Sequence, residues 1–181
     1  MNDRDIVLCV TGGIAAYKAA ALASRLRQDG ASVTVAMTDA AQKLVTPHTF
    51  EGVTGNPVAT TLWPEPGLYR LDHISLAERA DLVVVAPATA NIIAKAAAGI
   101  ADDLVSTTLV TLGADRPVVI APAMNNRMWA NPVVQRNVRT LKDLGWHVVE
   151  PGEGWLACGE KGPGRMADPD DIRAVIETTL Q

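Results

Sequence analysis

The stretch Ile6-Val7-Leu8-Cys9-Val10-Thr11-Gly12-Gly13, residues 6–13, decides the fold of this chain. Its first five residues are apolar, which is typical of a strand buried on both faces of a sheet. The two glycines predict a tight turn, and residues 14–28, rich in Ala, Leu and Arg, predict a helix. Gly30 stands where a glycine commonly ends a helix. The stretch therefore predicts a strand, a turn and a helix in succession.

The same alternation continues along the chain. Apolar runs predict further strands at 33–37, 82–86, 117–121 and 146–149. Helices are predicted at 47–50, 91–98, 102–112 and 132–144, and from Pro169 onward. Residues 56–71, 122–131 and 151–166 are predicted as loops, the last because it holds five glycines. This order predicts one α/β domain over residues 1–181, a doubly wound parallel sheet in a Rossmann-like or flavodoxin-like three-layer fold.

The composition fits a single soluble domain. The 181 residues carry a net charge of −4 and are 48% hydrophobic, which is ordinary for a chain with a sizeable core. Mild acidity argues against a nucleic-acid binder, and no apolar run approaches the roughly 18 residues that a membrane helix needs. No signal peptide is visible, and two cysteines are too few for a disulfide scaffold. We therefore expect a cytoplasmic, reducing location.

Polar or glycine-bearing stretches follow four of the predicted strands, at 11–13, 38–39, 88–91 and 124–126. Ligands of parallel α/β sheets bind at this edge, outside the carboxyl ends of the strands. At 11–13 the glycine amides and the positive end of the helix dipole favour an anion. The spacing matches neither the dinucleotide fingerprint nor the P-loop, so it suits the single phosphate of a mononucleotide better than a pyrophosphate. A tight turn that binds nothing is the alternative.

A few other side chains are candidates for chemistry. Cys9 lies in an apolar strand and is most simply a core residue, whereas Cys158 lies in a glycine-rich loop. A thiol there can act as proton donor or nucleophile, or be a chance loop cysteine. His73 can act as an acid or base, or cap a helix at the surface. Asn125 can bind a carboxylate, or only form a turn. No Cys and His cluster indicates a metal site.

Five motifs occur in the order found in a known family. They are TGGIAAYK at 11–18, HISL at 73–76, APATAN at 86–91, PAMN at 122–125 and ACGxxGxGRM at 157–166. This order resembles the phosphopantothenoylcysteine decarboxylases of coenzyme A biosynthesis, which are members of the flavin-containing cysteine decarboxylase family. The resemblance extends over nearly the whole chain.

The resemblance implies an FMN cofactor and assigns residues to the site. The implied cofactor-binding residues are Gly12, Gly13, Ile14, Thr38, Ala88, Thr89, Ala90, Asn91 and Ala123. The implied substrate-binding residues are Met124, Asn125, Trp155, Leu156, Ala157 and Arg165. Asn125 would bind the cysteine carboxylate of the substrate. His73 and Cys158 are implied as catalytic, with residues 151–166 forming a flap that brings Cys158 to the site as proton donor.

The resemblance also implies a reaction and an assembly. The substrate thiol side is oxidised, CO2 is lost, and the enethiol is reduced again to give 4′-phosphopantetheine. Similar enzymes are homotrimers with the flavin at subunit contacts, and some assemble four trimers. A lantibiotic-type peptidyl-cysteine decarboxylase and a non-catalytic flavin-binding regulatory subunit stay open as alternatives. The complete flap at 157–166 favours the full decarboxylase.

Two expectations concern the limits of this chain. Bacterial versions of the family are commonly fused to a phosphopantothenoylcysteine synthetase, and we expect no synthetase domain within residues 1–181. Such a synthetase would be a fused or separate partner. Contacts to the substrate phosphate have three candidates, Lys95, Lys161 and Arg165.

Overall fold

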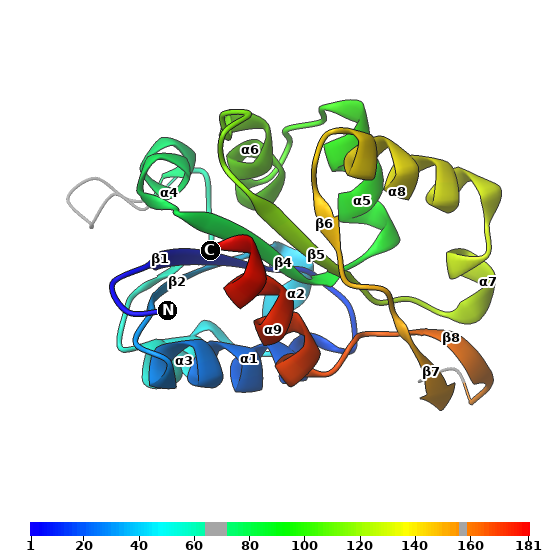
Figure 1. Cartoon of the computed structure of the whole chain (residues 1–181), viewed down its shortest axis with the longest axis horizontal. Helices are drawn as coiled ribbons and strands as arrows, with labels where there is room; N and C mark the ends of the chain where they lie inside the picture. Colours follow the sequence, from blue (N-terminus) through cyan, green and yellow to red (C-terminus); the bar gives the residue numbers. More distant parts are fainter. Residues whose placement is uncertain (64–71, 156–158) are drawn as a thin grey trace.

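A computed structural model describes residues 1–63, 72–155 and 159–181. Six parallel strands form one sheet in the order β3-β2-β1-β4-β5-β6 (Figure 1). The strands are β1 (Asp5–Val10), β2 (Ser32–Met37), β3 (Val58–Ala59), β4 (Leu82–Ala88), β5 (Val118–Pro122) and β6 (His147–Val148). This is the strand order of the Rossmann fold, so the predicted doubly wound α/β domain is confirmed.

Helices cover both faces of the sheet (Figure 1). One face carries α1 (Ala16–Gln28), α3 (Pro47–Thr54) and α9 (Pro169–Thr179). The other carries α4 (His73–Arg79), α5 (Ala90–Ala98), α6 (Leu104–Thr111) and α8 (Pro132–Asp143). Two short helices, α2 (Asp39–Gln42) and α7 (Asn126–Trp129), come soon after the ends of β2 and β5.

Each face of the sheet packs into its own apolar cluster. Leu22 and Phe50 are fully buried on the α1 side, and Leu76 and Leu141 are fully buried on the α4 side. Burying such a side chain contributes about 1.5–3 kcal/mol to folding. Strand β4 is buried along its whole length, as expected for a central strand covered on both faces. The core therefore fixes the sheet rigidly beneath the loops at its carboxyl edge.

Glycines end two helices of the α1 layer. Gly30 has a φ of +87°, and its amide donates to the carbonyl of Arg27 at 3.0 Å, which confirms the predicted helix end. Helix α3 extends beyond the predicted limit at Phe50 to Thr54, where Gly55 follows with a φ of +71°. A short proline-initiated motif shows clearly where a helix begins, but its end depends on packing.

The prediction that residues 151–166 form a loop is wrong. Strands β7 (Gly152–Trp155) and β8 (Lys161–Arg165) pair antiparallel as a hairpin outside the main sheet. The two strands have the sequences GEGW and KGPGR, so they show no alternation of apolar and polar residues. Glycine also has a low strand propensity, so nothing in the sequence indicates a strand here. Two further loop predictions also need correction, because residues 122–131 contain α7 and residues 56–63 contain β3. Residues 64–71 of the predicted loop lie outside the described residues.

Cys9 is buried in β1, as predicted for a core residue. Burial raises the pKa of its thiol to about 12, and the negative charge of Asp103 adds to the increase. We therefore expect Cys9 in a Cys158→Ser variant to react with a disulfide reagent at pH 8 about a thousandfold more slowly than a free thiol. Thiol titration before and after unfolding in guanidinium checks this. Rapid reaction of the native variant would contradict it, and a Cys9→Ser, Cys158→Ser variant is the control.

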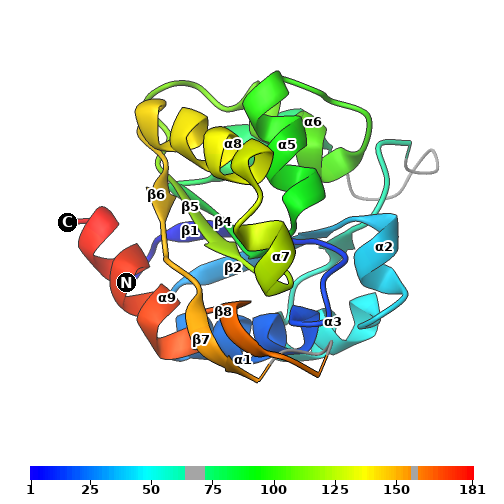
Figure 2. The ribbon, with the colours of Figure 1, turned by 90° about the vertical axis from the view of Figure 1, so that its right-hand side faces the viewer.

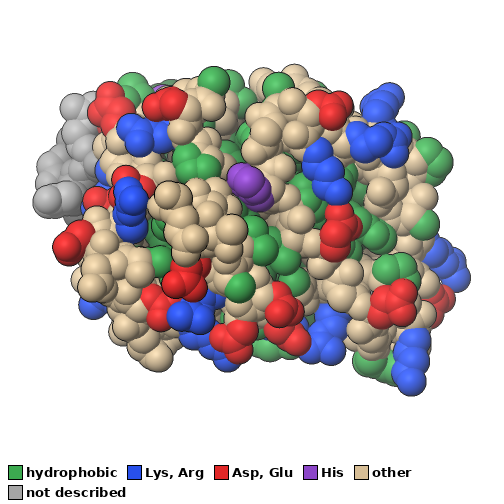
Figure 3. All heavy atoms as spheres, viewed as in Figure 1, with side chains coloured by type: hydrophobic (Ala, Val, Ile, Leu, Met, Phe, Trp, Pro, Cys, Tyr) green, Lys and Arg blue, Asp and Glu red, His purple; other side chains and the backbone are tan. Residues whose placement is uncertain are grey.

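The surface carries charges of both signs. On the face drawn in Figure 3, acidic and basic side chains are interspersed over the helices. Several form ion pairs, such as Arg25 with Asp170 at 2.8 Å, which links α1 to α9. None of the helices in the described parts of the chain is long and apolar enough to cross a bilayer.

Candidate active site

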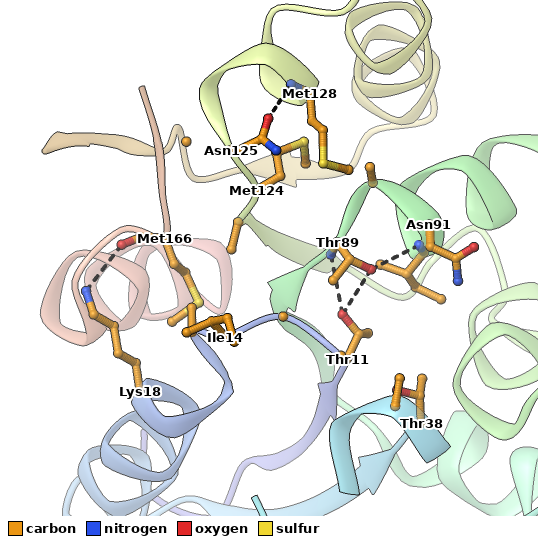
Figure 4. Close-up of a pocket in the computed structure, with 18 of the residues that line it drawn as sticks. Thr11, Ile14, Lys18, Thr38, Thr89, Asn91, Met124, Asn125, Met128 and Met166 are labelled. Carbon is orange, nitrogen blue, oxygen red and sulfur yellow. Dashed lines mark hydrogen bonds between the residues drawn. The ribbon is translucent and has the colours of Figure 1, made fainter. Parts of the chain in front are cut away.

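A cavity of about 820 Å³ lies at the carboxyl ends of β1, β2, β4 and β5 (Figure 4). Strand order reverses between β1 and β4, because β2 and β3 lie on one side of β1 while β4 to β6 lie on the other. Doubly wound sheets bind their ligands at such a point. The volume is in the range of sites that enclose a small organic ligand.

The cavity brings together segments that are far apart in the sequence. Its lining comprises residues 11–15, Tyr17, Lys18, 38–40, 89–92, Lys95, 102–103, 123–125, Met128, Trp155 and 164–166. Every predicted cofactor residue except Ala88 is in this lining. Met124, Asn125, Trp155 and Arg165 of the predicted substrate residues are there as well. The two predicted groups therefore share one cavity.

The turn between β1 and α1 has room only for glycine at position 12. A Cβ atom on Gly12 would lie 2.4 Å from the Cβ of Ala40, whereas one on Gly13 would lie 3.4 Å from its nearest neighbours. No side chain caps the start of α1, so the first amides of this helix lack a side-chain acceptor. Uncapped amides on a cavity wall, at the positive end of a helix dipole, favour a phosphate group.

Thr11 links the ends of β1 and β4 beside this turn. Its hydroxyl donates to the carbonyl of Pro87 at 2.6 Å. It also accepts from the amide of Thr89 at 3.3 Å (Figure 4). The hydroxyl of Thr89 accepts from the amide of Ile92 at 3.4 Å and caps α5. Segment 89–91 is therefore held in a fixed position relative to the phosphate-binding turn.

Three further predicted cofactor residues, Thr38, Ala88 and Ala123, differ in how they contribute to the cavity wall. Thr38 caps α2 by accepting from the amide of Ala41 at 3.2 Å. Ala88 is not in the cavity lining, because its side chain is fully buried in the core. Its carbonyl accepts from the amide of Ala123 at 3.0 Å. Ala88 thus supports the wall through its backbone, while Ala123 lines the cavity.

Asn125 has its carboxamide oriented by α7. The side-chain oxygen accepts from the backbone amide of Met128 at 2.8 Å and so caps that helix (Figure 4). The Nδ2 group remains as a neutral donor on a residue that lines the cavity. A side chain oriented in this way can bind a carboxylate without placing a charge beside it.

The hairpin docks on the Asn125 segment through glycines. A Cβ atom on Gly164 would lie 2.3 Å from the carbonyl oxygen of Met124, and its φ is +129°. The amide of Met124 donates to the carbonyl of Gly164 at 3.0 Å. At the other end of β8, a Cβ atom on Gly162 would lie 3.1 Å from the Cβ of Asn126. Figure 2 shows β8 running below α7. These two glycines therefore let β8 approach the backbone of residues 124–126 closely.

Part of the predicted flap lies outside the described residues. The residues concerned are Leu156, Ala157 and Cys158, which come between β7 and β8 in the sequence. Trp155, at the end of β7, lines the cavity with 67% of its surface exposed. Arg165, at the end of β8, also lines it. The role of Cys158 stays a prediction.

His73 is not brought to this cavity within one chain. It is the first residue of α4, where the carboxylate of Asp72 caps the helix by accepting from the amide of Ser75 at 2.9 Å. Helices α4 and α7 lie toward opposite ends of the molecule (Figure 1). The Nδ1 atom of His73 is buried and has no hydrogen-bond partner among the described residues. His73 is therefore outside the lining of the cavity in a single chain, and its catalytic role stays a prediction.

Lys95, which lines the cavity, is paired with two carboxylates. The ammonium of Lys95 contacts the carboxylates of Asp102 at 2.5 Å and Asp103 at 2.7 Å. Desolvation lowers the pKa of Lys95, but the hydrogen bonds that its ammonium donates to both carboxylates outweigh desolvation and raise that pKa overall. The hydrogen bond from Lys95 also lowers the pKa of Asp102. The positive charge of Lys95 is thus already balanced by two carboxylates, which weakens the prediction that Lys95 contacts the substrate phosphate. Lys161, another candidate for that contact, is not in the cavity lining.

Several lining residues were not predicted, among them Tyr17, Lys18, Asp102 and Asp103. Lys18 is in the first turn of α1, soon after the predicted cofactor residues Gly12, Gly13 and Ile14, and that closeness in sequence was a usable signal. The Asp102–Asp103 pair had no such signal, because it depends on how α6 packs beside α5. Among the described residues, no group of three or more His, Cys, Asp or Glu side chains is arranged to hold a metal ion.

Comparison with known proteins agrees with this geometry. The family model named Flavoprotein matches residues 1–181. The chain belongs to the Flavoprotein family. This flavoprotein is 49% identical, over 98% of its length, to the coenzyme A biosynthesis bifunctional protein CoaBC of Bacillus subtilis (strain 168). It is 47% identical, over 93% of its length, to the CoaBC protein of Escherichia coli (strain K12). The alignments span only 43% and 41% of those two proteins.

Solved structures of similar flavoproteins share the fold. A PPC decarboxylase mutant complexed with pantothenoylaminoethenethiol superposes with a TM-score of 0.86 and 29% identity, covering 98% of each chain. The FMN-dependent cysteine decarboxylase SpaF superposes with a TM-score of 0.83 and 35% identity, covering 98% of this chain and 95% of SpaF. Both superpositions therefore extend over almost the whole of each chain.

Proposed function

We propose that this flavoprotein catalyses the FMN-dependent decarboxylation of 4′-phosphopantothenoylcysteine to 4′-phosphopantetheine in coenzyme A biosynthesis. The CoaBC relatives and the PPC decarboxylase structure support this function. One observation carries it: the uncapped turn at Gly12 and the oriented carboxamide of Asn125 face the same cavity. The first suits a cofactor phosphate and the second suits a substrate carboxylate. We place the reaction in the cytoplasm, with a phosphopantothenoylcysteine synthetase, fused or separate, as partner.

The residues of the cavity fit FMN. Gly12 and the start of α1 would hold its single phosphate, since only glycine fits beside Ala40 and the first amides of α1 have no side-chain cap. Segments 38–40, 89–91 and Ala123 would surround the rest of the cofactor. When bound, FMN supplies a two-electron oxidation of the substrate's thiol side, which provides the electron sink for loss of CO2, and the later return of those electrons.

Asn125 is proposed to orient the substrate. Its Nδ2 group donates to the cysteine carboxylate, while its oxygen stays with the amide of Met128. A neutral donor holds the carboxylate in place without the strong ionic stabilisation that would oppose loss of CO2. The backbone hydrogen bond from Met124 to Gly164 holds residues 124–125 in place against β8.

Cys158 is proposed to deliver the last proton. Reduction of the enethiol to a saturated thiol needs a hydride equivalent from the reduced cofactor and a proton at carbon, and a thiol is a competent acid for that transfer. This role comes from the resemblance. It separates the proposed enzyme from relatives that stop at the enethiol.

We further propose a homotrimer in which His73 reaches the cavity of a neighbouring copy. The distance between α4 and α7 within one chain and the unpartnered Nδ1 atom of His73 support this arrangement. Apolar side chains are exposed around both places, with Ile74 at 49% beside His73 and Ile14 and Tyr17 at 62% and 63% on the cavity rim. Exposed apolar groups of this kind are typical of contact surfaces.

Mixed trimers test the shared site. Subunits carrying His73→Asn and subunits carrying Asn125→Asp are expected to be inactive alone, because each lacks one half of every site. Co-expression should restore activity in about a quarter of the sites, since random assembly pairs an intact His73 with an intact Asn125 at that frequency. The rate of CO2 release per FMN measures this. No recovery in isolated mixed trimers would contradict a site built from two chains.

The proposed reaction has a direct test. Protein saturated with FMN is incubated with phosphopantothenoylcysteine, and CO2 and 4′-phosphopantetheine are measured together. Equal amounts of both are expected. CO2 with accumulated enethiol would indicate a peptidyl-cysteine type of decarboxylase, and bound FMN without CO2 would indicate a regulatory flavin-binding subunit.

A further inference from the structure

Lys18 connects two parts of the chain that are 150 residues apart. Its ammonium donates to the carboxylate of Asp168 at 2.8 Å and to the carbonyl of Met166 at 3.5 Å. Figure 4 shows the side chain of Lys18 extending from α1 to Met166. Arg165 donates to the same Asp168 oxygen at 3.2 Å. The Lys18 side chain is 12% exposed and the Asp168 side chain is 60% exposed, so this contact, which we name the Lys18–Asp168 junction, is buried on the Lys18 side and open to water on the Asp168 side.

Asp168 is positioned for a different task from the one its sequence context predicts. It precedes Pro169 at the start of α9, where an aspartate commonly caps the helix with its side chain. Its carboxylate makes no such cap and turns instead to Lys18 and Arg165. The hydrogen bond from Lys18, more than any other contact, lowers the pKa of Asp168. The side chain therefore stabilises the junction and not the helix end.

The junction lies between the two walls of the cavity. On one side, Lys18 is in the first turns of α1, directly after the turn at Gly12. On the other side, Met166 is 1% exposed and follows Gly164, whose carbonyl accepts from the amide of Met124, next to Asn125. A shift at Met166 would therefore reach Asn125 along the chain to Gly164 and through one backbone hydrogen bond, from Met124 to Gly164.

We propose that Lys18 is a positioning residue, which acts through Met166 and Asp168 to hold the substrate-side wall at 164–166 against the cofactor-side wall of α1. This inference rests on the proposed function, because it assigns cofactor and substrate to those walls. In this proposal Lys18 acts through its contacts with Asp168 and Met166 and not on a reacting group. Lys18 would determine the position of Asn125 and of the end of β8 relative to the bound cofactor. Small displacements of substrate-binding groups weaken substrate binding strongly.

The test compares Lys18→Met with the wild-type protein, both saturated with FMN. We expect KM for phosphopantothenoylcysteine to rise about tenfold while kcat and the Kd of FMN stay within about twofold. Lys18→Arg, which keeps a donor to Asp168, should restore most of the wild-type KM. Asp168→Asn breaks the junction from its exposed side and should raise KM in the same direction, which keeps the test valid if Lys18→Met folds poorly. Arg25→Met is the matched control, because it removes another α1–α9 ion pair outside the cavity and should leave KM unchanged.

Three results would overturn the inference. They are a fall in kcat and melting temperature with KM unchanged, a loss of FMN affinity as the main effect, and an equal rise of KM in Arg25→Met. Failure of the proposed function is seen separately, as wild-type protein that binds FMN and releases no CO2. In that case titration of the flavin absorbance with phosphopantothenoylcysteine decides: about tenfold weaker binding by Lys18→Met supports the junction, and equal binding overturns it.

Discussion

Asn125→Asp is expected to lower kcat/KM by about a thousandfold, because a carboxylate in place of the carboxamide repels the substrate carboxylate and removes its donor. The fold of α7 should survive, since aspartate caps a helix as well as asparagine and can still accept from the amide of Met128. FMN content should also be unchanged, because the turn at Gly12 is untouched. Steady-state kinetics, with the absorbance of bound flavin measured on the same sample, checks both parts.

Asn131→Asp is the matched control for this substitution. Asn131 caps α8 by accepting from the amide of Val133 at 2.9 Å, is exposed, and lies outside the cavity lining. Its replacement makes the same chemical change at a helix cap without facing the substrate. Comparable losses in both variants, or full activity in Asn125→Asp, would show that Asn125 does not bind the carboxylate.

Gly12→Ala is expected to remove FMN from the purified protein. The new Cβ atom would lie 2.4 Å from the Cβ of Ala40, so the turn must move away from the phosphate position. We expect FMN to bind about a hundredfold more weakly, and the free energy of unfolding to fall by about 1–3 kcal/mol because of overpacking. The ratio of flavin to protein absorbance, FMN titration of the apoprotein and denaturant unfolding measure these effects.

Gly13→Ala separates this steric effect from a general intolerance of the turn. A Cβ atom on Gly13 would lie 3.4 Å from Pro87 and Thr89, at the edge of ordinary contact. This variant should keep most of its FMN and most of its stability. If the two alanine variants behaved alike, the contact with Ala40 would not be the reason that position 12 requires glycine.

Local sequence patterns predicted the main sheet well. The apolar run at Ile6–Val10 and the glycine at position 30 each act within a few residues, and both features are found where predicted. The β7–β8 hairpin was missed because its pairing depends on contacts between Gly162, Gly164 and the segment 124–126. Nothing in a glycine-rich stretch indicates which backbone it will pack against.

The site was predictable in its parts but not in its arrangement. Asn125 was identified, yet the orientation of its carboxamide depends on the short helix α7, which has too few residues for a periodic pattern. His73 was identified as a candidate acid or base, but its position outside the cavity lining depends on where α4 packs, beside α6. The Lys18–Asp168 junction joins residues separated by most of the chain, and pairings of that kind are decided only by tertiary structure.

The orientation of the Asn125 carboxamide also bears on product release. Its oxygen is committed to α7, so the site offers the ligand a donor and no acceptor at this position. A substrate with a carboxylate satisfies that donor, whereas the decarboxylated product has nothing there to accept the hydrogen bond. In the proposed reaction, loss of CO2 therefore removes one of the contacts that retained the substrate, and the final thiol product is held by the remaining contacts alone when it leaves.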